Sequence, residues 1–564
     1  MKKKTSVCYL ELNLGNSSSP AGRFAQGRFR PETELETLRV LKQAASDKKL
    51  GGVFLNTSGF SSNKEYLWEL LKALEICKNA GKKIVAYFDN IDLDHYSFLS
   101  VSDKIIMDSG GLLAFFGHSW GRFFVKESLD KLGIGFRELR YLDYKSATDT
   151  FARTTISDAD KEQYGAYLDD TFNLTKATII QNRSSQNRTF IEEDFDALLK
   201  NGVILSPMEA KNRNLVDAIG REETIKETIK ELEFADPEKG KLNFVSAGNM
   251  SCGFFNPTQK EAGYIAKRNR GFWVSEIAVV HARGATDLEQ GMVARNVSRS
   301  IRELAQKSRV KALVVRIDSP GGSAVAADFV AEAIAEVKKK IPVVVSFGQV
   351  AASGGYWAAM YANHIAASPY TLTGSIGVIG SWFFDKGLNG KLGFNFDALT
   401  RGEHADLGAG FILPKRDLSD EEEDRFRRCL LDLYAEFVKK VAVGRNMKEE
   451  ELEVLARGRV YSGLASQRLG LTDSLGGYLE ALETARELAG IPASKKLKIR
   501  EYPKPKFFEK MAAKAFSAAI SREHSLSPLL KAIEKHQLWG DLSYRLSNNG
   551  QIMPILPLSQ QHRR

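Results

Sequence analysis

The sequence predicts an α/β protein with two tandem copies of one unit, each a parallel-rich sheet covered by helices. The first observation is an internal repeat: KLGIGFREL at 131–139 and KLGFNFDAL at 391–399 are identical at five of nine positions, 260 residues apart. The same offset aligns two apolar stretches, 51–60 and 311–320. Apolar runs that alternate with amphipathic segments are typical of buried parallel strands with helices on both faces.

The second copy shows this alternation most clearly. β-branched apolar runs predict strands, and apolar residues at helical spacing predict the helices between them. The expected elements are strands at 275–284, 311–319 and 343–347, helices at 292–307 and 326–340, and a long helix at 417–443 whose counterpart in the first copy is 158–176.

The repeat also predicts the domain organisation. We expect a first repeat at 1–240, a linker at 241–270, a second repeat at 271–500 and a C-terminal extension at 501–564. Within the extension, residues 505–520 are amphipathic and carry lysines. This pattern predicts a packed terminal helix or, less commonly, a helix that lies on a membrane surface.

Composition excludes several classes of function. The chain has 564 residues and a net charge of +10, from 80 basic and 70 acidic residues, without zinc-finger spacing or interleaved aromatic and basic residues, so we expect no nucleic-acid partner. Four scattered cysteines predict neither a disulfide framework nor a metal site. No apolar run reaches 18 residues and the N-terminus lacks the apolar core of a signal peptide, which predicts a soluble or peripherally bound protein.

One stretch, residues 343–380, carries the strongest chemical signal. An apolar strand pattern is followed by AASGG and then by YWAAMYANHI, which predicts a short buried helix. Ser353 thus lies between strand and helix, flanked by Ala352 and Gly354, and the unpaired N–H groups of a helix start could stabilise an oxyanion above it. The alternative is a glycine-rich turn packed tightly against a neighbouring strand.

Comparison of the two copies predicts a composite site. Leu93 stands opposite Ser353, so the first copy lacks the serine. Ala405 stands opposite Lys145, so the second copy lacks the lysine. The losses are complementary, which predicts that Ser353 and Lys145 act together. A lysine can take the serine proton only when it is neutral, and burial favours the neutral amine. Alternatively, Lys145 is an ordinary surface lysine.

Other groups compete for these roles. His364 and His404 are alternative bases, and Asp318 or Asp406 could complete a serine–histidine–carboxylate triad. The turn DSPGGS at 318–323 could supply oxyanion donors from Gly321 or Gly322, or be a simple Pro-Gly turn. It does not match a nucleotide-binding loop.

Four motifs carry a resemblance to a known family. They are RIDSPGGSA at 316–324, VAASGGYWAAMYANHIAASPYTLTGSIGVIG at 350–380, GRVYSGLASQRLGLTDSLGG at 458–477 and YKSATDTFARTTISD at 144–158. With them the chain resembles the signal peptide peptidase A (protease IV) family in its long, tandem-repeat form. The resemblance implies a ClpP/crotonase-like fold and a serine–lysine protease with Ser353 as nucleophile and Lys145 as base.

The resemblance also implies a bowl-shaped homotetramer that degrades released signal peptides and other small apolar peptides, with no metal and no cofactor. Long-form members often begin with a membrane-spanning segment, which is not predicted here. Membrane association is therefore expected through the basic surface or through 505–520, with a cytoplasmic or peripheral location as the alternative.

These expectations combine into one mechanism. Ser353 attacks a peptide carbonyl, Lys145 accepts and returns the proton, Gly354 with Gly321 or Gly322 holds the oxyanion, and Ser146 orients the lysine. The peptide lies extended along a strand edge. The alternatives are a crotonase-like acyl-CoA enzyme, which needs an oxyanion hole but no nucleophilic serine, and a non-catalytic peptide-binding scaffold.

Overall fold

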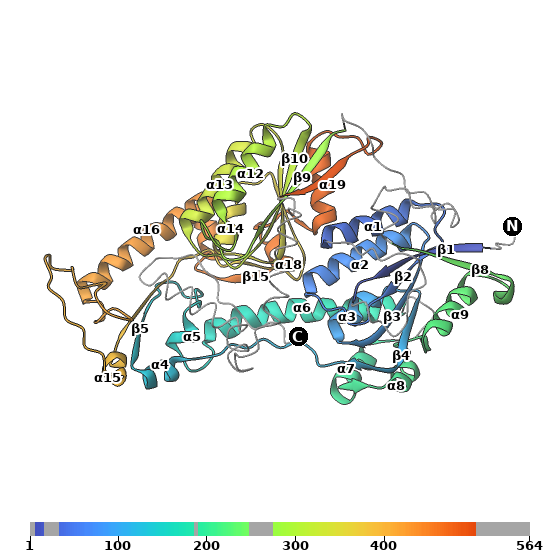
Figure 1. Ribbon diagram of the computed structural model, residues 1–564, viewed down its shortest axis with the longest axis horizontal. Helices are drawn as coiled ribbons and strands as arrows, with labels where there is room; N and C mark the ends of the chain where they lie inside the picture. The colour runs from blue at the N-terminus through green and yellow to red at the C-terminus, as the bar shows by residue number, and fades with distance from the viewer. Residues whose placement is uncertain (1–5, 16–32, 185–189, 247–273, 503–564) are drawn as a thin grey trace. The chain divides into compact units, whose positions relative to one another are not determined.

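The computed structural model describes residues 6–15, 33–184, 190–246 and 274–502 (Figure 1). The predicted helix at 505–520 and most of the predicted linker lie outside these ranges. The chain forms two compact units: unit 1 holds residues 1–119 and 169–272, and unit 2 holds 120–168 and 273–563. Among the described residues, no helix combines the length and hydropathy needed to cross a membrane.

Unit 1 is built on a mostly parallel seven-stranded sheet in the order β6-β4-β3-β2-β1-β8, with β7 paired to β4. Only the short β6 runs antiparallel to its neighbour, β4. The strands are β1 (Ser6–Asn13), β2 (Gly52–Asn56), β3 (Lys83–Ile91), β4 (Lys104–Ala114), β6 (Ile204–Leu205), β7 (Ala218–Ile219) and β8 (Lys241–Ser246). The helices are α1 (Glu34–Ser46), α2 (Lys64–Asn79), α3 (Leu93–Leu99), α7 (Glu192–Asn201), α8 (Pro207–Asn212), α9 (Glu222–Glu233) and the 3-10 helix η1 (Pro237–Lys239).

Unit 2 repeats this sheet with eight strands in the order β15-β13-β11-β10-β9-β17, where β12 pairs with β11 and β16 with β12. Its central strands are almost wholly apolar and buried, as the predicted parallel sheet requires. They are β9 (Glu276–Arg283), β10 (Val310–Ser319), β11 (Val343–Ala352), β12 (His364–Ala367), β13 (Leu372–Gly374), β15 (Val460–Ser462), β16 (Ser474–Leu475) and β17 (Lys498–Tyr502). The helices are α4 (Lys126–Leu132), α5 (Asp149–Ala152), α12 (Ala294–Ala305), α13 (Ala324–Val337), α14 (Gly354–Ala359), α15 (Leu388–Leu392), α16 (Asp420–Arg445), α17 (Glu449–Leu455), α18 (Gly463–Arg468) and α19 (Tyr478–Leu488).

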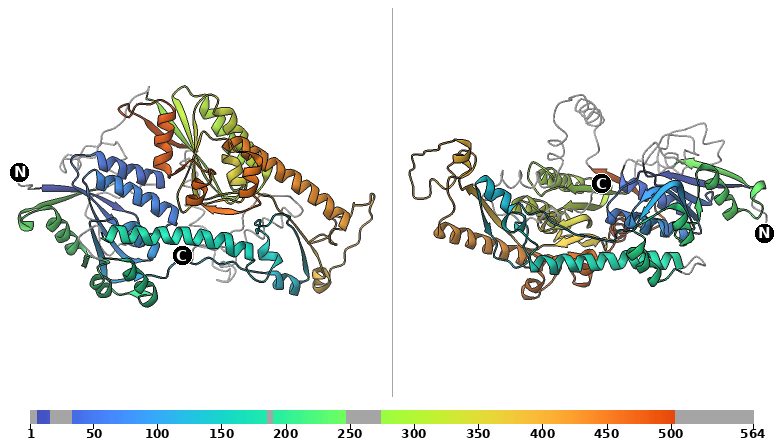
Figure 2. Two further views of the ribbon diagram at one scale, coloured as in Figure 1. Left: turned by 180° about the vertical axis from the view of Figure 1, so that it is seen from behind. Right: turned by 90° about the horizontal axis from the view of Figure 1, so that it is seen from below.

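A separate two-stranded ribbon joins parts of unit 2 that are far apart in sequence. β5 (Ile134–Leu139) pairs antiparallel with β14 (Gly380–Asp385). Figures 1 and 2 show β5, α4, α15 and the first turns of α16 gathered at one end of this unit, away from its large sheet. Because β5 and the loop after it come from the first repeat, the compact units do not coincide with the two sequence repeats.

The predicted α/β class with parallel-rich sheets is confirmed, and the sheets extend further than the sequence indicated. β8 pairs with β1 along its whole length, and β17 pairs with β9 in the same way. Residues 241–246, which the sequence analysis placed in the linker, therefore form an edge strand. The long helix α6 (Asp158–Ser184) begins where it was predicted and continues eight residues further.

Candidate active site

Ser353 lies at the point where β11 ends and α14 begins. Its backbone has φ 58° and ψ −117°, a conformation that residues other than glycine rarely adopt. The strand side is fixed by a hydrogen bond from the Ser353 amide to the Gly374 carbonyl, at 2.8 Å, and the helix side by one from the Trp357 amide to the Ser353 carbonyl, also at 2.8 Å. The serine is fully buried. Two rigid elements thus hold one hydroxyl in a strained turn.

Lys145 reaches this serine from the loop between β5 and α5. Its side chain is buried, with 1% exposed, and its amine lies 2.6 Å from Ser353 Oγ. The same amine donates to the carbonyl oxygen of Ser375 at 2.8 Å and lies 2.9 Å from Ser375 Oγ. Both Lys145 and Ser353 belong to unit 2. The structure therefore brings together, within one chain, the two groups that the sequence paired.

The backbone of Lys145 packs directly on a glycine turn before β15. A Cβ built on Gly458, which has φ +83°, would lie 2.6 Å from Lys145 Cβ and 2.7 Å from its backbone nitrogen. On one side of this turn the Tyr144 amide donates to the Arg457 carbonyl, and on the other the Ser375 amide donates to the Arg459 carbonyl. The GRVYS motif therefore holds both the lysine and Ser375.

Ser146, which the sequence analysis expected to orient the lysine, bonds Arg122 and Gln163. Its hydroxyl accepts from Arg122 Nη2 at 3.3 Å and from Gln163 Nε2 at 3.2 Å, and its carbonyl accepts from Arg122 Nη1. Arg122 also pairs with buried Asp160 at 2.8 Å. Burial raises the pKa of Asp160 above its ordinary value although Arg122 opposes the shift. Ser146 thus fixes the loop beside Lys145 through a buried polar cluster.

The two glycine turns meet next to Ser353. A Cβ on Gly354 would lie 3.1 Å from the amide nitrogen of Gly322 and 3.2 Å from Gly321 Cα. Gly322 itself, at φ +151°, would place a Cβ 2.3 Å from the Thr286 carbonyl oxygen, so Gly322 requires glycine and Gly354 is tightly packed. The Gly321 amide donates to Ser319 Oγ at 3.2 Å. These contacts leave the Gly322 and Gly354 amides as the better oxyanion candidates.

The alternative histidine bases make contacts elsewhere. The predicted helix at 356–365 was wrong in its second half, because α14 ends at Ala359 and β12 begins at His364. Asn363 stops the helix by exchanging hydrogen bonds with Val343 at the start of β11. His364 Nε2 lies 2.8 Å from Ser474 Oγ, and the Oδ1 of Asp318 accepts from the Val350 amide.

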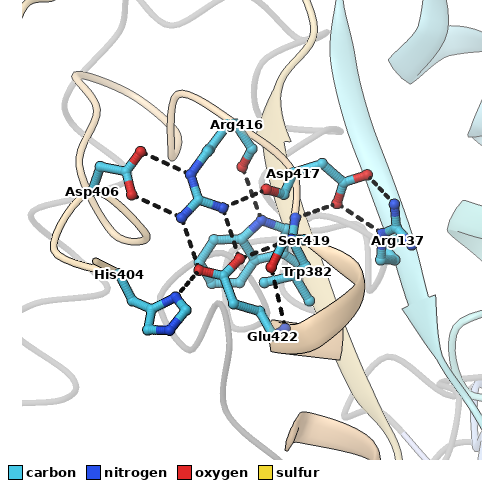
Figure 3. A network of polar contacts seen from close by, with 9 residues as sticks. Arg137, Trp382, His404, Asp406, Arg416, Asp417, Ser419 and Glu422 are labelled. Atoms are coloured by element: carbon cyan, nitrogen blue, oxygen red, sulfur yellow. Dashed lines mark hydrogen bonds and ion pairs between the residues drawn. The ribbon is translucent and has the colours of Figure 1, made fainter. Parts of the chain in front are cut away.

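His404 belongs to a different polar network, which Figure 3 shows at the start of α16. His404 Nδ1 lies 2.8 Å from Glu422 Oε1, and Arg416 bonds both Glu422 and Asp406. Arg416 holds the pKa of Glu422 well below its ordinary value. This network anchors a loop, and the contacts of His404 and Asp406 do not connect it to Ser353.

The position equivalent to Ser353 in the first repeat, Leu93, has different surroundings. α3 begins at Leu93, the residue opposite Ser353, with Asp92 as its N-cap. Asp92 Oδ1 lies 2.7 Å from His95 Nδ1, and Asp94 Oδ1 lies 2.8 Å from His118 Nε2. Histidine–aspartate contacts thus stand where the second repeat has its serine turn.

Sequence reasoning missed Ser375, which contacts the lysine amine twice. Like Ser353 it has a positive φ, 52°, and it is buried. It lies in TGSIGVIG, a segment whose glycines signal an irregular turn but give no hint that the serine side chain points at a lysine.

The chain is similar to known proteases over most of its length. The model of Peptidase family S49 matches residues 76–235 and 335–492. Serine protease SPPA, chloroplastic, of Arabidopsis thaliana is 29% identical over 512 residues, which cover 89% of this chain and 72% of that protein. Protease 4 of Salmonella typhi is 28% identical, covering 82% of this chain and 73% of its own length.

A similarity to a solved structure is weaker. ClpP1 from Listeria monocytogenes aligns with 36% of this chain and 94% of its own, at 17% identity and a TM-score of 0.23. The family match, by contrast, falls in both repeats and covers more than half of the sequence. The chain therefore belongs to Peptidase family S49 and is a serine protease.

Proposed function

We propose that Ser353 is the nucleophile and Lys145 the general base of this protease. The observation that carries the proposal is the 2.6 Å contact between Lys145 Nζ and Ser353 Oγ, made by two buried side chains. A nucleophile and a base within hydrogen-bond distance, with the base held by a third group, are the signature of an activated serine. Ser375 supplies that third group.

The hydrogen bonds of the Lys145 amine are consistent with a general base. A neutral amine has two hydrogens and one lone pair. The two oxygens of Ser375 can accept the hydrogens, at 2.8 Å and 2.9 Å, and the lone pair then faces the Ser353 hydroxyl. When Ser353 attacks a peptide carbonyl, its proton moves to Lys145, and the ammonium later gives it to the leaving amine.

The developing oxyanion is assigned to the amides of Gly322 and Gly354. Gly354 opens α14, and the first N–H groups of a helix have no carbonyl partner within that helix. Gly322 approaches it because neither residue has a side chain. Preorganised N–H donors of this kind are each worth about 10²–10³-fold in rate.

The substrates that we propose are released signal peptides and other small apolar peptides, bound extended along a strand edge. The motifs shared with signal peptide peptidases support this class, as does a site built from small side chains. The same resemblance supports a homotetramer that contacts a membrane peripherally. The acyl-CoA alternative gains no support from the site, because an oxyanion hole alone would not need the lysine beside Ser353.

A fluorophosphonate probe tests the dyad. Wild-type protein should be labelled and should cleave an apolar peptide, whereas Ser353→Ala should lose labelling and about 10⁴-fold or more in kcat/KM. Lys145→Ala should lose both as well. Matched controls are Ser298→Ala, a buried serine of α12, and Lys161→Ala, an exposed lysine of α6, both expected to retain activity.

Either of two results with these variants would refute the assignment of the dyad. If Lys145→Ala is labelled at the wild-type rate, the lysine is not the base. If Ser353→Ala retains peptide cleavage, the nucleophile is another residue. If the protein turns over an acyl-CoA and is not labelled by the probe, the acyl-CoA alternative is favoured.

A further inference from the structure

The glycine turn that supplies Gly322 is held by one residue of another loop. Thr286 follows the end of β9, and the turn at 318–323 follows the end of β10, the parallel neighbour of β9. The Thr286 amide donates to the Gly321 carbonyl at 2.8 Å, and the Ser323 amide donates to the Thr286 carbonyl at 2.7 Å. The backbone of Thr286 therefore binds the peptide groups on both sides of Gly322.

These two hydrogen bonds decide which way the Gly322 N–H points. A trans peptide group is planar and carries its C=O and its N–H on opposite sides. Because the Gly321 carbonyl points at the Thr286 amide, the Gly322 N–H in the same peptide group points away from that amide. A half-turn of this peptide group would exchange the N–H donor for a carbonyl oxygen, and it would break the hydrogen bond from Thr286. The Thr286 backbone thus fixes the direction of the donor.

The side chain of Thr286 adds a second link to the same turn. Thr286 Oγ1 and Ser319 Oγ are hydrogen-bonded at 3.0 Å, and Ser319 Oγ accepts from the Gly321 amide at 3.2 Å. Both side chains are fully buried, where a hydroxyl is stable only when it is hydrogen-bonded. Thr286 therefore holds the Gly321 carbonyl directly and the Gly321 amide through Ser319.

The same pair of hydroxyl residues supports the start of α14. A Cβ built on Gly354 would lie 3.2 Å from Thr286 Oγ1. A Cβ built on Gly355 would lie 2.6 Å from the Ser319 carbonyl oxygen and 3.2 Å from Ser319 Cβ. Both glycines of α14 thus pack directly on the Thr286–Ser319 pair, which lies against Gly354 while it holds the turn that contains Gly322.

Thr286 is itself held by a short closed turn. It forms an antiparallel bridge with Gly291, and the Met292 amide donates to the Ala285 carbonyl at 2.9 Å. Gly291 has φ +51°, and a Cβ at this position would lie 2.4 Å from the Ala285 carbonyl oxygen. The close approach of these two backbone segments leaves Thr286 little freedom to move.

We propose that Thr286 is a positioning residue, which holds the Gly322 and Gly354 amides at the spacing and in the direction that an oxyanion requires. The inference rests on the proposed function, since it takes these two amides as the oxyanion donors. Such donors act on charge that develops only in the transition state. Loosening them should therefore lower kcat and leave substrate binding nearly unchanged.

Thr286→Val tests this role in the full-length protein. The change replaces the hydroxyl by a methyl group and keeps the backbone hydrogen bonds. We expect kcat to fall about 10–100-fold, less than the roughly 10²–10³-fold cost of losing a whole donor, with KM nearly unchanged. Thr286→Ser keeps the hydroxyl and should recover most of the loss. The matched control is Thr472→Val in a second buried pair, Thr472 Oγ1 and Ser466 Oγ at 2.9 Å, which should retain the wild-type kcat.

A peptide aldehyde provides a readout that a merely structural role would not move. Addition of Ser353 Oγ to the aldehyde carbon forms one C–O bond, and the carbonyl electron pair moves to the oxygen that occupies the oxyanion position. Thr286→Val should weaken aldehyde binding by the same factor as kcat/KM. Binding of the matching peptide alcohol, which forms no adduct, should not change.

Ser319→Ala breaks the same link from its other end, so the test remains available if Thr286→Val does not fold. Because both changes act through one link, the double variant should lose little more than Ser319→Ala alone. Wild-type kcat in both single variants, equal losses of aldehyde and alcohol binding, or additive losses in the double variant would overturn the proposal.

The two levels of inference can be separated. Peptide cleavage by Ser353→Ala would remove the proposed function and this inference with it. Full activity of Thr286→Val beside an inactive Ser353→Ala would remove this inference alone.

Discussion

Removal of the Ser375 hydroxyl is the sharpest test of how the lysine is held. Ser375 Oγ lies 2.9 Å from Lys145 Nζ, while the Ser375 carbonyl at 2.8 Å is unaffected by the change Ser375→Ala. One of two contacts from this residue is lost. When the amine accepts the serine proton it becomes an ammonium, and hydrogen bonds to charged groups are stronger than neutral ones. The loss is therefore greater in the transition state than in the resting enzyme.

The expected magnitude follows from that difference. Loss of one hydrogen bond of this kind costs about 1–2 kcal/mol, which corresponds to a fall of about 5–30-fold in kcat. KM should change little, because the hydroxyl that is removed contacts the lysine amine. The hydroxyl stabilises the protonated lysine, so its removal should also move the acidic limb of the kcat–pH profile to lower pH.

Peptide hydrolysis measured from pH 5 to pH 10 separates this role from a structural one. The matched control is Thr371→Val, which removes a buried hydroxyl that donates to the Gly348 carbonyl at 2.8 Å and does not touch the lysine. It should destabilise the fold slightly and leave the pH profile in place. If Ser375→Ala leaves both kcat and the acidic limb unchanged, Ser375 does not position the base.

Three further outcomes are expected. Gly458→Ala should lower kcat about 10²-fold while the circular dichroism spectrum is retained, because the new Cβ meets Lys145 Cβ at 2.6 Å and displaces the lysine. If the variant has the kcat of the wild type, this contact does not position Lys145. Arg122→Gln should reduce the free energy of unfolding by about 3–5 kcal/mol in urea titrations, since it leaves Asp160 buried without its cation, and Arg122→Gln with Asp160→Asn should recover part of the loss. In unit 1, the hydrogen bond from Arg221 lowers the pKa of Asp108 to about 2, so this pair stabilises the native state above pH 3.8 and the stabilisation disappears as the pH falls toward 2. Arg221→Ala should therefore speed hydrogen exchange of β4 at pH 7 and much less at pH 2. Equal effects at both pH values would exclude the ion pair as the cause.

The sheets could be predicted because their signal is local. Runs such as VVVSF and ALVVRI are apolar on both faces, which only a covered parallel strand explains, and these became β11 and β10. The failure at 356–365 has the same origin. A short apolar run has no period that separates a buried helix from a buried strand, so the end of α14 depends on hydrogen bonds between Asn363 and Val343, which sequence spacing does not show.

The candidate site could be predicted where the signal was local or where the repeat supplied a comparison. Ser353 emerged from its place between a strand and a helix, and Lys145 emerged because the two copies have lost complementary residues. Ser375 and Arg122 did not, because their roles depend on contacts with residues distant in sequence. Nor could the repeat show that residues 120–168 belong to unit 2, since tandem copies suggest that each copy folds on its own.

Residues 120–168 come from the first repeat but fold with unit 2, which explains how a duplicated chain forms the Lys145–Ser353 pair. Lys145 follows β5 by six residues, so the ribbon with β14 delivers the lysine of the first repeat to the serine of the second. The reverse combination is absent, because the second repeat has Ala405 in place of the lysine and the first repeat has Leu93 in place of the serine. The two repeats therefore contribute one lysine and one serine to a single pair.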